Sequence, residues 1–91
     1  MSTDTHSQEF TIENEYGLHA RPAALFVKCA SQFEAEVMVE KDGMSVSGKS
    51  IMGLLTLEGH QGCTLTIEAS GPQAEEALAA LADLIGRNFD E

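Results

Sequence analysis

Several residue types are scarce in this chain, and each scarcity excludes a class of protein. There is no Trp among the 91 residues, and one Tyr with four Phe means that aliphatic side chains must build the core. No uncharged stretch approaches the ~20 apolar residues that a transmembrane helix needs. The two cysteines form no Cys-x-x-Cys pair, so nothing suggests a zinc cluster. We therefore expect one small domain with an aliphatic core.

Basic residues are also few. Five Lys and Arg stand against fifteen Asp and Glu, which gives a formal charge of −10 and a pI near 4.5. Such a surface repels nucleic acid and suits partners with basic docking faces. The first fifteen residues contain neither a basic nor an apolar segment, so we expect no signal peptide and no membrane insertion. We predict a soluble protein of the reducing cytoplasm, with Cys29 as a buried thiol.

The hydropathy pattern predicts a polar, flexible tail over residues 1–8 and a single domain over 9–91. Apolar residues alternate or recur at helical spacing in the order β-α-β-β-α-β-α. The expected strands are 9–13, 36–40, 44–47 and 64–68, and the expected helices are 20–33, 51–57 and a last one from 71. This order predicts an α/β (α+β) fold, an open-faced β-sandwich in which three helices cover one face of a four-stranded antiparallel sheet.

Particular residues support these elements. The Asp42-Gly43 pair predicts a hairpin turn. Ser50 is placed to cap the second helix. Helical spacing predicts that the buried positions of the three helices are Pro22, Phe26, Cys29, Ala30 and Phe33, then Leu54 and Leu57, then Ala77, Leu81, Leu84 and Ile85.

Of the three histidines, His19 has the most informative surroundings. His6 in the tail and His60 in a Gly-flanked loop are expected to be solvated without a role. His19 directly precedes a predicted helix start, where unsatisfied N–H groups and the positive helix end disfavour an imidazolium and keep the ring nucleophilic. The same N–H groups, with the Arg21 guanidinium, could receive the oxygens of a phosphoryl group. The alternative is that His19 merely caps the helix or packs against it.

Two neighbours of His19 shape this segment. Gly17 allows the loop to turn tightly and to keep the ring exposed. Pro22 lies in the first helical turn, where its missing N–H costs nothing. The whole segment, Gly17-Leu18-His19-Ala20-Arg21-Pro22-Ala23, resembles the active-site signature of HPr, the histidine phosphocarrier family of bacterial phosphoenolpyruvate-dependent phosphotransferase systems. A second block, Gly48-Lys49-Ser50-Ile51-Met52-Gly53, resembles the family's regulatory serine region.

The resemblance covers residues 9–88 and implies a division of labour. His19 would carry the phosphoryl group on its Nδ1 atom, Arg21 would stabilise that group, and Pro22 would shape the helix start. The donor would be Enzyme I and the acceptor a IIA-type domain. No metal or organic cofactor is implied, and the chain would be a stoichiometric carrier and not an enzyme. The sequence gives no sign of oligomerisation, and a shuttle must expose one face to several partners, so we expect a monomer.

The resemblance also implies roles around Ser50. This residue corresponds to the serine that an HPr kinase/phosphorylase modifies in many family members, while a plain N-cap is the alternative that stays open. Ile51, Met52 and Leu55 are implied as an apolar patch on which partners dock. Lys28, two turns past His19, is a candidate basic contact at its rim. The segment 71–91 is similar to the nitrogen-related branch and the block around Ser50 to the sugar-uptake or regulated branch, so the acceptor stays open.

Three rival functions can be weighed on the sequence. The stretch Gly43-Met44-Ser45-Val46-Ser47-Gly48-Lys49-Ser50 matches the P-loop pattern GxxxxGK[ST], but it alternates like a strand after a hairpin turn, which argues against a phosphate cradle. A non-carrier regulatory module of the same fold would bind a transcription factor or an enzyme through the helix that follows Ser50. A small-ligand domain is supported by topology alone. The pairing of His19 with Arg21 favours the carrier.

Overall fold

The computed structural model describes residues 5–90, which form one sheet and three helices. The elements in chain order are β1 (Thr5–Thr11), α1 (Ala20–Ala30), β2 (Glu36–Lys41), β3 (Met44–Ser47), α2 (Ile51–Thr56), β4 (Thr64–Ser70), α3 (Ala74–Gly86) and a final 3₁₀ turn, η1 (Asn88–Asp90). The predicted element order is confirmed.

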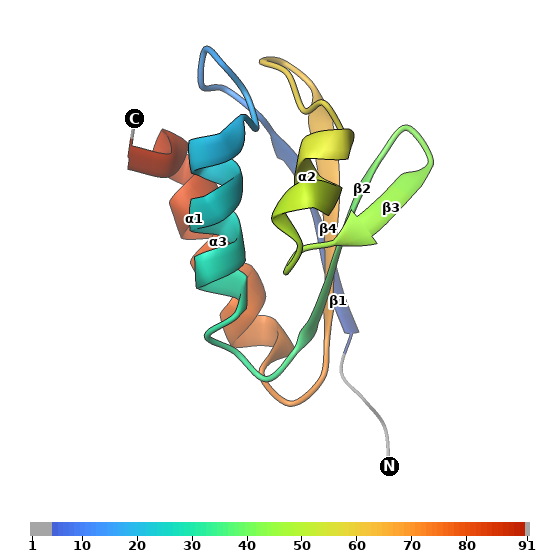
Figure 1. Cartoon of the computed structure of the whole chain (residues 1–91). Helices are drawn as coiled ribbons and strands as arrows, with labels where there is room; N and C mark the ends of the chain where they lie inside the picture. The colour runs from blue at the N-terminus through green and yellow to red at the C-terminus, as the bar shows by residue number, and fades with distance from the viewer. Residues whose placement is uncertain (1–4, 91) are drawn as a thin grey trace.

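The sheet has the strand order β1-β4-β2-β3, and each neighbouring pair is antiparallel. The three helices lie on one side of this sheet (Figure 1). The β2–β3 hairpin turns at Asp42 and Gly43, whose φ angles of 52° and 85° are both positive, as the predicted two-residue turn requires. The open-faced sandwich is therefore confirmed. Within residues 5–90, each helix is too short or too polar to cross a membrane.

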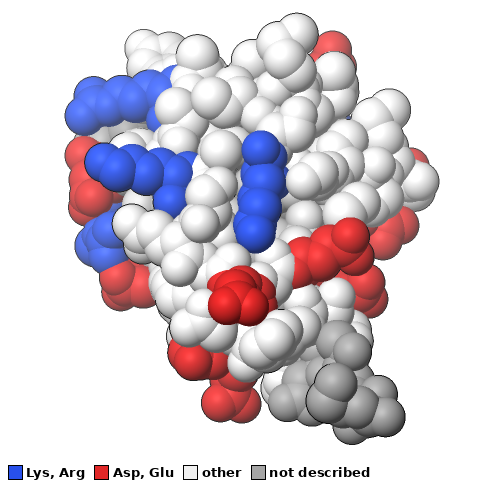
Figure 2. Space-filling view, turned by 60° about the horizontal axis from the view of Figure 1, so that its bottom comes forward, with Lys and Arg blue, Asp and Glu red and all other residues white. Residues whose placement is uncertain are grey.

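Charge is unevenly spread over the surface. On the face in Figure 2, Lys and Arg side chains lie toward the left and the centre, and Asp and Glu side chains dominate the lower half. The left side carries α1 and α3 (Figure 1). Arg21 and Lys28 belong to α1, and Arg87 follows α3, where it pairs with Asp83 and Asp90. Because Arg87 is paired with acids, the exposed cations of α1 are the main positive feature of this side.

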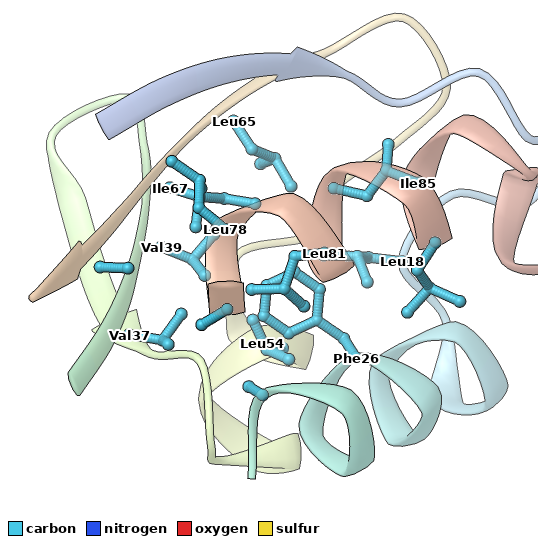
Figure 3. Close-up of a cluster of buried hydrophobic side chains, with 14 of the residues drawn as sticks. Leu18, Phe26, Val37, Val39, Leu54, Leu65, Ile67, Leu78, Leu81 and Ile85 are labelled. Carbon is cyan, nitrogen blue, oxygen red and sulfur yellow. The ribbon is translucent and has the colours of Figure 1, made fainter. Parts of the chain in front are cut away.

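The core lies between the helices and the covered face of the sheet (Figure 3). Phe26 of α1 and Leu54 of α2 are fully buried against strand residues such as Val37 and Ile67. The predicted core residues that the structure buries are Pro22, Phe26, Ala30, Leu54, Leu57, Ala77, Leu81, Leu84 and Ile85. This aliphatic packing fixes the three helices relative to one another.

The first strand begins earlier than predicted. Residues 5–8 are not a tail, because Thr5 pairs with Ser70 and the register continues to Thr11. His6 is therefore a half-buried strand residue opposite Ala69, and not a solvated tail residue. The prediction failed because these residues lack an apolar alternation, while the backbone of β4 offers partners along its whole length. The rest of the predicted tail, residues 1–4, lies outside the described residues.

The first helix is shorter than predicted. It ends at Ala30, and the N–H of Ser31 donates to the carbonyl oxygen of Val27 at 2.9 Å as the chain turns away. Phe33 therefore lies beyond the helix and is half-buried. Cys29, predicted to be buried, is also only half-buried, whereas Ala23 is fully buried.

The last helix begins at Ala74 and not at the predicted residue 71. Gly71 has a φ of 121°, which no helix contains. Gln73 precedes the helix and is held by the loop before β2: its N–H donates to the carbonyl oxygen of Glu34 at 3.0 Å, and its Oε1 accepts from the Glu34 N–H at 2.7 Å. This tertiary link, which no local pattern signals, sets where α3 starts.

Candidate functional site

His19 is the N-cap residue of α1, as the sequence predicts. Its backbone is extended, with φ −78° and ψ −172°, and its carbonyl oxygen accepts the N–H of Ala23 at 3.0 Å. The side chain is half-buried and makes no capping hydrogen bond. The imidazole therefore does not cap the helix, and it is not enclosed in the core. It lies at the positive end of an eleven-residue helix.

Gly17 brings the segment before His19 against a second loop. Its φ is +65°, and a Cβ atom there would collide with the carbonyl oxygen of Gly59. The N–H of Leu18 donates to that same oxygen at 2.7 Å. Asn14 closes the turn from the other side, since its Nδ2 donates to the carbonyl oxygen of Gly17 at 2.8 Å. A glycine is thus required here both by backbone conformation and by close approach.

Arg21 and Pro22 occupy the first turn of α1. Arg21 is exposed, two positions after His19, so its guanidinium can reach groups in front of the helix. Pro22 is buried and lacks the N–H that would otherwise need an acceptor at this point of the helix. The backbone N–H groups of this first turn have no acceptor within the helix. Anionic oxygens placed near His19 would therefore meet several donors.

A shallow depression of about 170 Å³ lies beside the imidazole. Its lining comes from two loops and consists of Tyr16, Leu18, His19, Glu58, Gly59 and His60. The ring of Tyr16 meets the ring of His19 edge-on. His60 is exposed, as predicted, but it shares this depression with His19. No sequence pattern pointed to Tyr16, Glu58 or His60, because contacts across forty residues leave no periodic signal.

The helix α2 presents the second predicted feature. Ser50 caps it, with Oγ accepting the Gly53 N–H at 3.0 Å. Ile51 and Met52 are exposed by 41% and 73% respectively, whereas Leu55 is half-buried. The first two therefore form an apolar surface next to Ser50, whereas Leu55 packs partly against the core.

Lys28 lies away from this apolar surface, along α1. It lines a groove between α1 and α3 together with Leu25, Cys29 and Arg87. The structure thus places Lys28 on the side of α1 that faces α3, where it is exposed.

The same groove is lined by Cys29. Burial raises the pKa of the Cys29 thiol, the nearby Arg87 guanidinium opposes that rise, and Asp83 adds to it.

The P-loop-like stretch forms no phosphate cradle. Residues 44–47 are strand β3, and Gly43 belongs to the hairpin turn before it. The Nζ of Lys49 donates to the carbonyl oxygen of Phe33 at 3.2 Å. A P-loop needs a glycine-rich loop that leads into a helix, whereas this stretch is an edge strand.

Known proteins match most of this chain. Residues 6–87 match the family model described as the PTS HPr component phosphorylation site. The phosphocarrier protein HPr of Neisseria meningitidis serogroup B is 45% identical over 84 residues, which cover 92% of this chain and 94% of that protein. The phosphocarrier protein NPr of Escherichia coli K12 is 41% identical over 88 residues, covering 96% and 98%. The HPr-like protein Crh of Halalkalibacterium halodurans is 45% identical over 74 residues, covering 81% and 88%.

Solved structures agree with these relatives. The crystal structure of HPr-C-His from Thermoanaerobacter tengcongensis superposes with a TM-score of 0.92 at 48% identity, covering 94% of this chain and 97% of that one. A structure from the same organism, described as an HPr dimer, gives a TM-score of 0.78 at 50% identity and covers 90% and 94%. Sequence and architecture thus point to the same family.

Proposed function

The chain belongs to the HPr family of phosphocarrier proteins, and on that premise we propose that His19 accepts a phosphoryl group from phosphorylated Enzyme I and passes it to a IIA-type acceptor. The observation that carries the proposal is the imidazole at the N-cap of α1, half-exposed and not used for capping. A side chain in that position can meet a phosphorylated partner and then meet another.

The transfer exchanges one nitrogen–phosphorus bond for another. The lone pair of the His19 Nδ1 atom attacks the phosphorus held by the donor's phosphohistidine. The new N–P bond forms as the old one breaks, and the electron pair of the broken bond returns to the donor's ring. The proton on the other ring nitrogen of His19 can stay in place throughout. Delivery to the acceptor repeats the same exchange in the forward direction.

The first turn of α1 supports the charge of the transferred group. Phosphoryl transfer depends mainly on positioning and on stabilising negative charge. The backbone N–H groups of Ala20 and Arg21 lie at the positive helix end and suit the phosphoryl oxygens. The Arg21 guanidinium adds a full positive charge with several donors in a fixed plane. We therefore assign Arg21 to the stabilisation of phosphorylated His19.

The partner surface belongs to the same proposal. We assign docking to Ile51 and Met52, with Leu55 beneath them, because an exposed apolar patch on a small acidic domain suits a protein interface. Lys28 supplies a basic contact away from this patch. The chain works in the cytoplasm as a monomer, so that one face is presented to successive partners. It is modified stoichiometrically and is a carrier, not a catalyst.

Regulation at Ser50 is a further part of the proposal. A phosphate on its Oγ would add negative charge beside Ile51 and Met52 and would displace the cap to Gly53. An HPr kinase/phosphorylase would supply that phosphate from ATP. Both effects would weaken docking of a partner that approaches over α2.

A second candidate function is a regulatory module that binds a transcription factor or an enzyme through α2. The similarity to the HPr-like protein Crh and the exposed Ile51 and Met52 beside the half-buried Ser50 favour it. His19 and Arg21 together favour the carrier function, because a module that only binds partners needs neither a nucleophilic imidazole nor a guanidinium beside it. Phosphorylation of His19 distinguishes the two functions, because only the carrier requires it.

The decisive test is incubation with phosphoenolpyruvate and Enzyme I, followed by intact-mass measurement. We expect one phosphoryl group per chain, labile to acid and stable to base. His19→Ala should remove it, while His6→Ala, which changes a histidine at the far end of β1, should keep it. Label that persists in His19→Ala would overturn the assignment of the acceptor.

The role of Arg21 needs its own variants. Arg21→Ala should slow phosphorylation and shorten the lifetime of the phosphorylated chain, and Arg21→Lys should restore part of each, since it keeps the charge but not the planar fork. Kinetics of Arg21→Ala that equal those of the wild type would assign charge stabilisation to the helix end alone.

A further inference from the structure

The loop between α2 and β4 lies against the phosphoacceptor. Glu58 and His60 flank Gly59, whose carbonyl oxygen accepts the Leu18 N–H at 2.7 Å. This contact fastens the loop directly beside His19. Both flanking side chains line the depression that the imidazole also lines. An acidic residue and a second histidine therefore share this depression with His19.

The backbone at Glu58 is strained. Its φ is +53°, in the left-handed region that favours glycine and costs a residue with a side chain about 1–2 kcal/mol. Glu58 directly follows Leu57, the C-cap of α2, and a left-handed residue at this point commonly ends a helix. This helix end places an exposed acidic residue at the depression that His19 also lines.

We propose that Glu58 and His60 are positioning residues that set the charge and the hydrogen-bond donors facing the phosphoryl group on His19, and thereby the lifetime of the phosphorylated chain. The proposal rests on His19 as the phosphoacceptor. The Glu58 carboxylate repels the anionic phosphoryl oxygens and favours departure of the group. The N–H of the His60 imidazole can donate a hydrogen bond to those oxygens and favours retention. Arg21 acts in the same direction as His60, from the helix side.

The reaction to follow is hydrolysis of the phosphorylated chain. Water forms a bond to phosphorus, the N–P bond breaks, its electron pair returns to the His19 ring, and inorganic phosphate leaves. The variants are Glu58→Gln, which removes charge but keeps polarity and size, and His60→Ala, which removes the imidazole donor. Matched controls are Glu68→Gln and His6→Ala, on the β-strands β4 and β1. All chains are loaded by Enzyme I and then freed of it.

We expect Glu58→Gln to lengthen the phosphoryl half-life about two- to fivefold at low salt, and this gain should shrink at about 1 M salt because screening removes long-range charge effects. His60→Ala should shorten the half-life by a similar factor, because it removes the donor. Glu58→Gly should lengthen the half-life like Glu58→Gln and also raise the free energy of unfolding, since glycine relieves the strain.

Half-lives of Glu58→Gln and His60→Ala that equal those of the two controls would overturn the inference. A change in Glu58→Gln that persists undiminished at about 1 M salt would overturn it too, because that would mark a structural effect. These outcomes require a wild-type chain that accepts phosphate. A wild-type chain that accepts none would contradict the proposed function itself, and with it this inference.

Discussion

The ring of Tyr16 meets the ring of His19 edge-on, with centroids 6.0 Å apart and an interplanar angle of 86°. The side chain of Tyr16 is 74% exposed, so it contributes little to the core. An edge-to-face partner limits the orientations open to the imidazole. Tyr16 therefore holds the His19 ring in place from the loop side.

Removing that contact should affect transfer more than folding. Edge-to-face pairs contribute about 0.5–1.5 kcal/mol, so Tyr16→Ala should slow phosphorylation by Enzyme I several-fold. Its free energy of unfolding should stay within about 0.5 kcal/mol of the wild type because the side chain is exposed. Tyr16→Phe keeps the ring and should transfer at the wild-type rate. A slow Tyr16→Phe would assign the effect to the hydroxyl.

The close approach at Gly17 can be tested by unfolding in urea. Gly17→Ala combines a left-handed backbone with a collision at the Gly59 oxygen, so we expect a loss of more than about 3 kcal/mol. Gly62→Ala is the matched control. Its φ is +92°, but a Cβ atom there meets nothing within 4 Å, so only the backbone cost of about 1–2 kcal/mol applies. Equal losses in the two variants would mean that the two loops separate easily.

Variants of Ser50 can distinguish its role as a helix cap from the effect of a negative charge at this position. Ser50→Ala should lower the free energy of unfolding by about 1 kcal/mol, because the Gly53 N–H loses its acceptor. Ser45→Ala, on the exposed side of β3, should change it by less than about 0.5 kcal/mol. Ser50→Asp restores an acceptor and should recover stability, yet it should slow transfer from Enzyme I. Transfer at the wild-type rate in Ser50→Asp would count against regulation by charge at this residue.

The raised pKa values of the two thiols predict how the free energy of unfolding depends on pH. Burial raises the pKa of both Cys29 and Cys63; Arg87 opposes the rise at Cys29, and Lys41 opposes it at Cys63. A raised pKa means that the folded chain keeps its thiol protons above about pH 8.5, where the unfolded chain loses them. The free energy of unfolding should therefore fall as the pH rises beyond that value.

This dependence is measured by urea unfolding at about pH 7 and about pH 9.5. The variant with Cys29→Ala and Cys63→Ala should lose less stability between the two pH values than the wild type does. The comparison cancels the titration of other groups, which both proteins share. An equal loss in both would show that the thiols do not contribute.

The sequence predicted the segment around His19 well because its signals are local. A glycine before the histidine and a proline after it mark a tight turn and a helix start, and both act within a few residues. The cap at Ser50 and the hairpin at Asp42-Gly43 are local in the same sense. Each was placed correctly without knowledge of the rest of the chain.

What escaped prediction depends on contacts between distant segments. The strand residues 5–8 carry no apolar alternation and are ordered by pairing with β4. The start of α3 follows from the link between Gln73 and Glu34. The depression that joins Tyr16 and His19 to Glu58 and His60 exists because Gly17 admits the Gly59 carbonyl, and no pattern in either loop reports the other.

The carrier role is tested most directly by following the intact mass of the chain through a full cycle. The chain is first loaded by Enzyme I, then separated, and then given IIA domains of the sugar and nitrogen branches in turn. We predict that one phosphoryl group appears on the wild-type chain, moves to a IIA domain and leaves the chain at its original mass, and that His19→Ala takes up none. A phosphoryl group that stays on the chain until water removes it, with either IIA domain present, would contradict the account.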